Sequence, residues 1–285
     1  MEKLKRNFKY YFLGILFLAT CLVWYAVLVE SNDKLKVAFL DVGQGDAIFI
    51  EAPGGNQMLI DGGPNKAVLS ALSKVMPFYD RSIDLVLMTH PDADHANGLV
   101  DVLGRYKVGA FVDSGVTPEK PVHKEIENLV AEKGIADLNL IKGYRINLGE
   151  GAYVDIVSPP VAGDSVDSNN GSVVGHLVYG NNSFLLTGDM EQKMEKYLVA
   201  TGADIKSDVL KVGHHGSRTS TAPEFLGSVA PKYAVISVGK NNKYGHPHRE
   251  TISTLNQFGV STLQTDQLGT IIFESDGQNI SLENQ

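Results

Sequence analysis

Six of the eight histidines of this 285-residue chain lie in three short segments, and acidic residues accompany them. The first segment is Thr89-His-Pro-Asp-Ala-Asp-His95, directly after the apolar run Ile83-Asp-Leu-Val-Leu-Met88. Imidazole nitrogens and carboxylate oxygens are common ligands of divalent cations, so two histidines and two aspartates in one loop can converge on an ion. The alternative is that Asp94 caps a helix and the histidines are exposed. The spacing after a buried strand favours metal binding.

The backbone of this segment is constrained by Pro91, which favours extended structure and delays a helix. His90 and Asp92 are therefore expected to point the same way. Asp94 and His95 are expected at the turn into a helix that begins near Asn97.

Three further segments carry groups of the same kinds. Phe184-Leu-Leu-Thr-Gly-Asp189 predicts a strand that ends in a glycine turn and a carboxylate, although one such Asp is more often a helix cap. In Val212-Gly-His-His-Gly-Ser-Arg-Thr219, adjacent histidines on extended backbone would point to opposite sides, so one can bind a metal while the other faces substrate. Tyr244-Gly-His-Pro-His248 is equally well explained as a polar surface turn.

The composition is that of a folded globular protein, with 43% hydrophobic residues and a formal net charge of −8. A single cysteine, Cys21, excludes an intramolecular disulfide and a zinc site built on paired thiolates. Metal chemistry would have to use histidines and carboxylates. The acidic balance disfavours a broad nucleic-acid-binding surface but allows a local one.

The elements that must position these residues alternate between short strands and helices from residue 35 onward, which predicts a single α/β domain over residues 35–285. Gly54-Gly-Asn56 predicts a hairpin turn, so part of the sheet should be antiparallel. The run Asp84 to His90 resembles Asp208 to His214, which suggests two related halves that each deliver a histidine to a shared sheet edge. Short similarities of this kind also arise between unrelated buried strands. Strands are predicted at 36–40, 47–50, 57–60, 83–88, 109–112, 153–157, 173–179, 183–187, 207–212, 232–238, 261–265 and 270–274, helices from Pro64 and at 121–133, 191–200, 223–229 and 249–258, and a long loop at 162–170.

The N-terminal residues 1–31 are predicted to be a basic cytoplasmic tail followed by a transmembrane anchor. Tyr10 to Val29 contains no charged residue and is long enough to span a bilayer as a helix. Lysines and an arginine precede this run, so the positive-inside rule places the N-terminus in the cytoplasm and the remainder outside. A cleaved signal peptide is the alternative, but the apolar run is long and no A-x-A site follows it.

The ordered segments resemble a known family. H-x-D-x-D-H, T-G-D and G-H-H-G-S in this order resemble the metallo-β-lactamase fold, a four-layer αββα sandwich. Together with Asp41-Val-Gly-Gln-Gly-Asp46, Leu59-Ile-Asp-Gly-Gly63 and Tyr244-Gly-His-Pro-His248, they are similar to the metallo-hydrolase domain of ComEC-type DNA-uptake proteins. This resemblance covers nearly all of residues 35–285.

The resemblance implies a ligand set for one or two divalent cations: His90 and Asp92 for one, Asp94 and His95 for a second, Asp189 as a bridge and His214 as the last ligand. His214 is chosen over His215 because it matches His90 in the internal similarity. Asp61 would support a neighbouring loop. The family's usual histidines are replaced by Asp92 and Asn170, and oxygen in place of nitrogen favours Mn²⁺ over Zn²⁺.

These features predict a membrane-anchored, metal-dependent phosphodiesterase or nuclease that acts on DNA outside the membrane. The catalytic residues would be Asp94, His215 and His248, and the substrate would be bound by Ser217, Arg218, Thr219, Tyr244 and His246. With a single predicted span the chain cannot conduct DNA, so a separate channel protein would be its partner. The alternatives are hydrolysis of another extracytoplasmic phosphodiester or small nucleotide, and a non-catalytic anchor in a DNA-uptake assembly.

Overall fold

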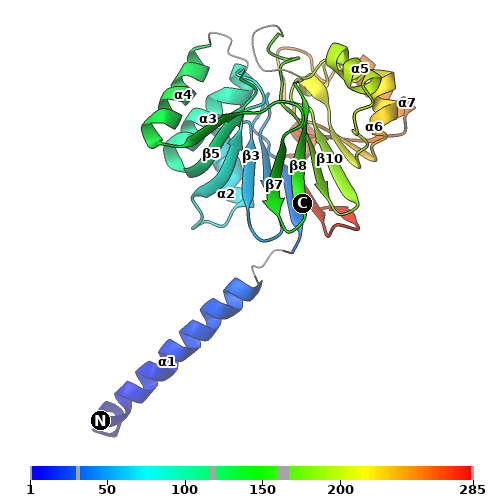
Figure 1. Ribbon diagram of the computed structural model, residues 1–285. Helices are drawn as coiled ribbons and strands as arrows, with labels where there is room; N and C mark the ends of the chain where they lie inside the picture. Colours follow the sequence, from blue (N-terminus) through cyan, green and yellow to red (C-terminus); the bar gives the residue numbers. More distant parts are fainter. Residues whose placement is uncertain (1, 30–32, 116–119, 160–166, 284–285) are drawn as a thin grey trace.

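The computed structural model describes residues 2–29, 33–115, 120–159 and 167–283. It begins with a long helix, α1 (Glu2–Val29), which extends away from the rest of the molecule (Figure 1). The segment Asn7–Tyr25 of this helix is 19 residues long, apolar enough to cross a membrane, and 0% buried. A membrane anchor and a signal sequence both have such a segment.

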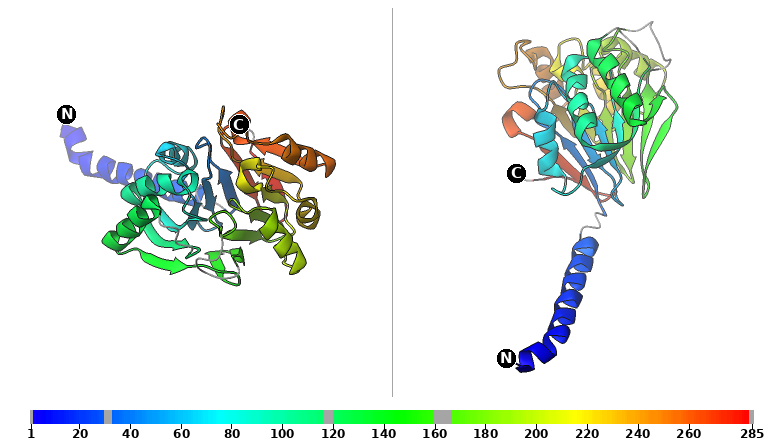
Figure 2. Two further views of the ribbon diagram at one scale, coloured as in Figure 1. Left: turned by 90° about the horizontal axis from the view of Figure 1, so that it is seen from above. Right: turned by 90° about the vertical axis from the view of Figure 1, so that its left-hand side faces the viewer.

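The remainder is built on two β-sheets that pack face to face (Figures 1 and 2). The first sheet contains β1 (Leu35–Phe39), β2 (Ile48–Glu51), β3 (Gln57–Ile60), β4 (Ser82–Leu87), β5 (Lys107–Asp113), β6 (Ala136–Asn139), β14 (Ile271–Ser275) and β15 (Ile280–Leu282). The second contains β7 (Arg145–Gly149), β8 (Ala152–Ser158), β9 (Val174–Tyr179), β10 (Asn182–Leu186), β11 (Val209–Lys211), β12 (Tyr233–Ile236) and β13 (Ser261–Gln264). Their orders are β15-β14-β1-β2-β3-β4-β5-β6 and β13-β12-β11-β10-β9-β8-β7.

Helices cover the outer face of each sheet (Figure 2). Buried apolar side chains of α2 (Ala67–Val75), α3 (Ala93–Arg105) and α4 (Pro121–Lys133) pack on the first sheet. Those of α5 (Gln192–Ala200), α6 (Pro223–Val229) and α7 (Arg249–Gln257) pack on the second. A short helix, α8 (Thr265–Leu268), follows β13. These four layers confirm the predicted αββα sandwich.

The central core lies between the two sheets. The edges of Phe39 and Phe184 both meet the ring of Phe273, with centroids 6.2 and 6.0 Å apart, so β1, β10 and β14 are joined across the interface. Strands such as β3 are buried at every position because helices cover one face and the other sheet covers the opposite face. The sheets are mixed: β2 pairs antiparallel with β1 and, through the predicted hairpin, with β3, whereas β3, β4 and β5 run parallel.

Several sequence expectations need correction. Helix α3 begins at Ala93 and not near Asn97, because Asp92 already has the extended backbone of a helix N-cap and the helix starts directly after it. Helix α2 begins at Ala67, three residues beyond Pro64. Strands β6, β7 and β15 were not predicted. The predicted loop at 162–170 lies partly outside the described residues, and its described part, 167–170, is a turn.

Candidate metal centre

The candidate site lies where strands of both sheets end, on the side of the sandwich away from α1 (Figure 1). In the first sheet, β1 leads to the loop of Asp46, β3 leads to Asp61, and β4 leads to His90. In the second sheet, β10 leads to Asp189 and β11 leads to His215. Loops that follow strand ends in this way are the usual position of ligand sites in α/β folds.

Backbone contacts hold the loop of Asp46 against the loop of the first histidines. The Asp46 N–H donates to the Asp94 carbonyl oxygen at 3.2 Å. Gly45 has a φ of +141°, and a Cβ there would lie 2.1 Å from the Asp94 carbonyl oxygen. The second glycine of the Gly43-Gln-Gly45 segment is therefore explained by close approach of two backbones, and Gly43 by its φ of +84°.

Four overlapping groups of histidines and aspartates could hold a cation, and within each group the ligand atoms lie within 4.8 Å of one another. Asp189 is central, because its Oδ1 lies 3.3 Å from His95 Nε2 and its Oδ2 lies 3.4 Å from His215 Nε2. Asp94 Oδ2 also lies 3.4 Å from His215 Nε2. The groups are His90, His95 and Asp189; Asp94, His95 and His215; Asp46, Asp189 and His215; and Asp46, Asp61 and His95.

The hydrogen bonds of the histidine rings leave one nitrogen of each ring free to bind a metal. His95 Nδ1 lies 2.8 Å from Asp61 Oδ2, and His215 Nδ1 lies 2.9 Å from the Ser237 carbonyl oxygen. Both partners accept, so these hydrogen bonds place the proton on Nδ1. The Nε2 atoms of both rings are buried and have no hydrogen-bond partner within the described part of the chain. A histidine that donates through one nitrogen to an acidic or carbonyl oxygen is the usual arrangement for ligation through the other.

His90 follows the same arrangement through a hydroxyl. Its Nδ1 lies 3.0 Å from Thr89 Oγ1, which itself donates to Asp61 Oδ2 at 2.7 Å. The His90 Nε2 is likewise buried and lacks a partner among the described residues. Asp61 thus orients two of the three histidines, and the buried donor set fits a divalent cation.

Without a cation, protonated His95 and His215 balance the negative charge of the buried carboxylates beside them. Burial opposes a charge on His95 and His215, but the Asp189 carboxylate, with Asp61 beside His95 and Asp46 beside His215, raises the pKa of each ring well above its ordinary value. Burial and the nearby His95 lower the pKa of His90 to about 4. A divalent cation would displace protons from such ligands, so its binding would be coupled to proton release.

The geometry distinguishes the two adjacent histidines. His215 belongs to two of the four groups, whereas His214 belongs to none of them. The His214 side chain is 26% exposed, and its Nε2 lies 3.9 Å from Asp189 Oδ2. The expectation of extended backbone here was wrong, because φ is +48° at His214 and +51° at His215. This left-handed turn still separates the two rings, whose planes differ by 71°.

Asp92 and Asn170, the positions where the family usually has histidines, bind neighbouring side chains. The Asp92 carboxylate contacts Lys120 Nζ and Ser168 Oγ, and it lies 3.9 Å from His90 Nε2. The Asn170 side chain donates to Asp167 at 3.0 Å and accepts from the Glu191 N–H at 3.3 Å. Neither residue belongs to a group that could hold a cation.

Of the residues expected to bind substrate, Tyr244 and His246 line a cavity beside the centre, whereas Ser217, Arg218 and Thr219 do not. A cavity of about 180 Å³ is lined by Gln44, Asp94, His214, Tyr244 and His246, among others. The Tyr244 and His246 rings stack at 5.6 Å, and the Arg218 N–H donates to His248 Nδ1 at 3.2 Å. Thr219 Oγ1 lies 3.0 Å from Ser217 Oγ and 3.3 Å from His214 Nδ1. The structure therefore places Tyr244 and His246 beside Asp94 and Asp189, and hydrogen bonds connect the loop of residues 217–219 to His214 and His248.

Sequence reasoning missed Asp46 and Lys211. Lys211 is 0% exposed, and its Nζ lies 2.5 Å from Asp46 Oδ2 and 3.8 Å from Asp189 Oδ1. Burial works against ionisation of Asp46, but the Lys211 ammonium, together with His215 and His95, outweighs it and holds the pKa of that carboxyl below its usual range. A signal was present in the sequence, because a lysine in the otherwise apolar strand before the His-His pair needs a buried partner.

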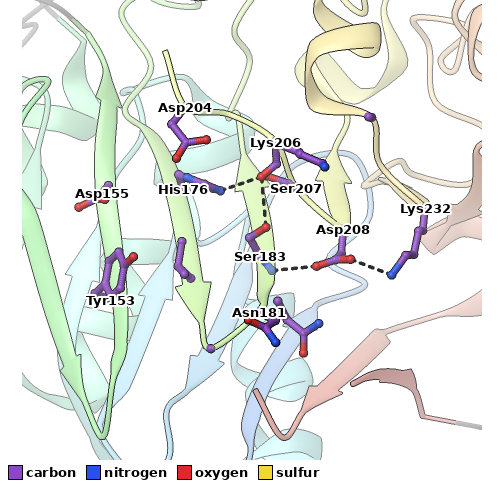
Figure 3. A pocket seen from close by; sticks show the side chains of 14 residues that line it. Tyr153, Asp155, His176, Asn181, Ser183, Asp204, Lys206, Ser207, Asp208 and Lys232 are labelled. Atoms are coloured by element: carbon purple, nitrogen blue, oxygen red, sulfur yellow. Dashed lines mark hydrogen bonds and ion pairs between the residues drawn. The ribbon is translucent and has the colours of Figure 1, made fainter. Parts of the chain in front are cut away.

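A larger cavity, of about 550 Å³, lies at the opposite ends of strands β10, β11 and β12 (Figure 3). Its polar groups pair with one another: His176 Nε2 lies 3.2 Å from the Lys206 carbonyl oxygen, and Asp208 binds Lys232 at 3.0 Å. None of its lining residues belongs to a group that could hold a cation. Cavity size therefore does not identify the centre.

The family is decided by the match of residues 40–240 to the model of the metallo-β-lactamase superfamily. The chain belongs to the metallo-β-lactamase superfamily. Together with the buried His and Asp groups, membership of this superfamily indicates a metal-dependent hydrolase.

The chain is similar to proteins that include some named for competence or recombination. The chain is 33% identical over 270 residues to ComE operon protein 3 of Bacillus subtilis (strain 168), an alignment that covers 88% of this chain and 34% of the relative. It is 29% identical over 265 residues to competence protein ComA of Neisseria gonorrhoeae, covering 91% of this chain and 35% of the relative. The chain thus spans about a third of the length of these relatives.

Solved metallo-β-lactamase structures share the fold at low sequence identity. The metallo-β-lactamase fold protein YhfI from Bacillus subtilis superposes with a TM-score of 0.58 at 11% identity, covering 85% of this chain and 100% of that one. Igni18, a metallo hydrolase from Ignicoccus hospitalis, superposes with a TM-score of 0.55 at 16% identity, covering 85% and 99%. These likenesses establish the sandwich architecture alone.

Proposed function

We propose that this metallo-β-lactamase superfamily member is a metal-dependent phosphodiesterase that cleaves DNA, with α1 as its membrane anchor and the sandwich outside the cytoplasm. The observation that carries the proposal is the convergence of three buried histidine Nε2 atoms, none with a hydrogen-bond partner among the described residues, around Asp189. The relatives named for competence support DNA as the substrate. A separate membrane channel protein would then deliver or accept the strand.

The donors we assign to the cation are His90, Asp94, His95, Asp189 and His215. His215 replaces His214 in this assignment because its Nε2 is buried between Asp94 and Asp189, at 3.4 Å from each carboxylate. Asp92 is left out because Lys120 and Ser168 already bind its carboxylate. Three imidazoles and two carboxylates suit Mn²⁺ or Zn²⁺, and the preference for Mn²⁺ expected from Asp92 and Asn170 loses its basis because neither residue belongs to the set.

When bound at these donors, a divalent cation supplies a water of lowered pKa and stabilises charge on a phosphoryl oxygen. The chain's own residues would position the phosphodiester at the opening. Ser217 and Thr219 hydroxyls and the exposed Arg218 offer hydrogen-bond donors to phosphate oxygens. His248 Nδ1 accepts from the Arg218 N–H, so in the neutral ring the proton is on Nε2, where it can be transferred to the leaving oxygen.

His246 has a different role from His248 in this proposal. Burial, together with the neighbouring His215, lowers the pKa of His246 to about 4, so its ring is neutral near pH 7. Tyr244, 51% exposed, stacks on it. An aromatic pair at the edge of the cavity can stack on a nucleic-acid base, which is how single strands are often bound without sequence preference.

The test is cleavage of linear single-stranded DNA by the full chain in detergent with Mn²⁺. Asp94→Asn should lower the rate by more than about 100-fold, because even residues that only orient a ligand cost about 10- to 100-fold. Asp101→Asn is the matched control, since Asp101 lies on the same helix and pairs with Arg105 at the surface. Cleavage of bis(p-nitrophenyl) phosphate or cyclic dinucleotides without cleavage of DNA would favour the small-diester alternative, which the net charge of −8 also supports. Failure to bind Mn²⁺ would favour a non-catalytic anchor.

The ligand assignment has its own test. His215→Ala should abolish high-affinity Mn²⁺ binding measured by calorimetry, whereas His214→Ala should retain it. The opposite result would restore His214 as the ligand.

A further inference from the structure

Lys211 places a positive charge inside the candidate centre. It is the last residue of β11, its side chain is 0% exposed, and its Nζ donates to the Gly188 carbonyl oxygen at 3.0 Å. The same Nζ lies 2.5 Å from Asp46 Oδ2. A buried ammonium is costly unless it is paired, and here its partner is a carboxylate that also belongs to two of the groups that could hold a cation.

The ammonium and a cation would compete for the same oxygens. The group of Asp46, Asp189 and His215 offers its ligand atoms within 4.8 Å of one another, yet Lys211 Nζ already lies against Asp46 and 3.8 Å from Asp189 Oδ1. Two like charges a few ångströms apart in a buried site repel each other strongly. A cation is therefore disfavoured on the Asp46 side and favoured at the group of Asp94, His95 and His215.

On the other side of Asp189, fewer side chains are available to bind a cation. The Asp92 carboxylate contacts a second ammonium, that of Lys120, and the Asn170 amide is held by Asp167 and the Glu191 N–H. His90 and Asp189 remain there, with His95 shared between the two sides. With Asp46 and Asp92 each held by an ammonium, the described residues offer one complete set of donors and an incomplete second one.

We infer that Lys211 takes the place of a second cation, so that the protein binds one divalent cation, held chiefly by Asp94, His95, His215 and Asp189 with His90 beside them, next to the Lys211 ammonium. This inference rests on the proposed metal-dependent function. Lys211 is a positioning residue in this arrangement: it holds Asp46 and balances the charge of the shared Asp189. The exposed fraction of 0% keeps its ammonium from direct contact with substrate.

The experiment measures how many Mn²⁺ ions the full chain binds in detergent, by equilibrium dialysis with elemental analysis, together with the electron paramagnetic resonance spectrum of the bound ions. The wild-type chain should bind one Mn²⁺ and give the six-line spectrum of an isolated ion. Lys211→Met removes the charge and leaves Asp46 without its partner, so it should bind two Mn²⁺ and give a spin-coupled spectrum, since paired metals lie about 3.5–4 Å apart. Lys232→Met should still bind one, because Lys232 is 69% exposed and pairs with Asp208 at the far end of the sheet.

The outcomes separate this inference from the proposed function. Two Mn²⁺ ions in the wild-type chain, or one in a folded Lys211→Met variant, would overturn the inference and leave the metal-dependent hydrolase standing. No Mn²⁺ in the wild-type chain would overturn both. If Lys211→Met does not fold, Lys211→Gln keeps a donor for Gly188 and Asp46 without the charge, and it should also gain the second ion.

Discussion

Asp61 shows how one side chain can set the geometry of the whole centre. Its carboxylate is 0% exposed and accepts from the Thr89 N–H at 2.8 Å and the Thr89 hydroxyl at 2.7 Å, and it binds His95 Nδ1 at 2.8 Å. One carboxylate thus orients His95 directly and His90 through Thr89. The affinity of the site for a metal therefore depends on a residue that need not bind the metal itself.

Asp61→Asn is expected to weaken Mn²⁺ binding by about 10- to 100-fold, because an amide nitrogen would face one of these donors in place of an acceptor. Calorimetric titration of the purified chain measures the affinity. Asp84→Asn is the control, since Asp84 accepts a backbone hydrogen bond from Gln57 at the other end of the sheet and should leave the affinity unchanged. An unchanged affinity in Asp61→Asn would contradict the role given to this network.

At the scale of residues, the sequence predicted the types and spacing of the donors but not their final partners. His90, Asp94, His95 and Asp189 were selected from short segments, and the structure brings them together. The choice between His214 and His215 depends on a left-handed turn at both positions, which local sequence does not specify for histidine. Asp92 could not be separated from Asp94 because its partners, Lys120 and Ser168, are distant in sequence.

Helix α3 is held against the neighbouring loop by a glycine. A Cβ at Gly98 would lie 1.9 Å from the Gly62 carbonyl oxygen, and the Gly98 N–H donates to the Gly63 carbonyl oxygen at 2.9 Å. The same helix contains Gly104, around which a Cβ would meet nothing within 4 Å. The two glycines therefore lie in the same helix, but only Gly98 is in close contact with a neighbouring backbone, so they form a matched pair for mutation.

Gly98→Ala should lower the free energy of unfolding by about 1–3 kcal/mol, because the added methyl group forces backbones apart. Gly104→Ala should raise it by about 0.5–1 kcal/mol, because alanine loses less entropy in a helix. Urea denaturation of both variants measures the difference. Equal effects at the two positions would show that the contact between α3 and Gly62 is not tight.

Helix α6 begins at a buried carboxyl group from another helix. Glu195 of α5 is 1% exposed and accepts from the N–H groups of Thr221 and Ala222, each at 2.7 Å. Burial outweighs these hydrogen bonds and raises the pKa of Glu195 from 4.5 to about 7. The folded state therefore holds a proton on Glu195 in a pH range where the unfolded chain has released it.

It follows that the free energy of unfolding should fall as the pH rises from about 4.5 to about 7, by up to about 3 kcal/mol from this group. Glu195→Gln cannot ionise and should flatten this part of the profile in urea denaturation at successive pH values. The exposed Glu224 of α6 provides the control, since Glu224→Gln should keep the wild-type slope. A variant Glu195→Gln with the wild-type slope would assign the pH dependence to other groups.

Strands that are buried on both faces were predictable, whereas among the four strands at the sheet edges only β13 was predicted. Strands such as β3 and β10 are largely apolar runs that the sequence displays directly. Strand β6 is exposed at every position and β15 has no buried residue, so neither carries an apolar pattern. Each forms because a neighbouring strand offers hydrogen bonds. That strand is a separate segment of the chain, so the local sequence of the edge strand does not predict the pairing.

At the scale of the whole molecule, the sandwich was predictable through ordered motifs, and the path of the chain between its sheets was not. The C-terminal strands β14 and β15 return to the first sheet and pair beside β1, although the strands just before them belong to the second sheet. No local pattern in the sequence specifies this return. The similarity between residues 84–90 and 208–214 did identify strands β4 and β11, which are central parallel strands of the first and second sheets.

Removal of the cation should lower the thermal stability of the whole sandwich. A ligand at 100 times its dissociation constant stabilises the folded state by about 2.7 kcal/mol, which corresponds to a shift in Tm of roughly 5–10 °C for a domain of this size. Thermal denaturation with Mn²⁺ and after EDTA treatment measures the shift. Asp94→Asn should show a much smaller difference, and an equal shift in that variant would place the stabilising ion elsewhere.

The donors of the centre are divided between loops that follow strands of opposite sheets: Asp94 and His95 belong to the first, and Asp189 and His215 to the second. An ion coordinated by both pairs would link the two sheets directly at one point, in addition to the packing of their inner faces. If the backbone were cut between β8 and β9, the two fragments should stay associated in Mn²⁺ and separate more readily in EDTA. The ion proposed for hydrolysis would then also stabilise the contact between the two sheets, and chelation would weaken that contact next to the proposed substrate site.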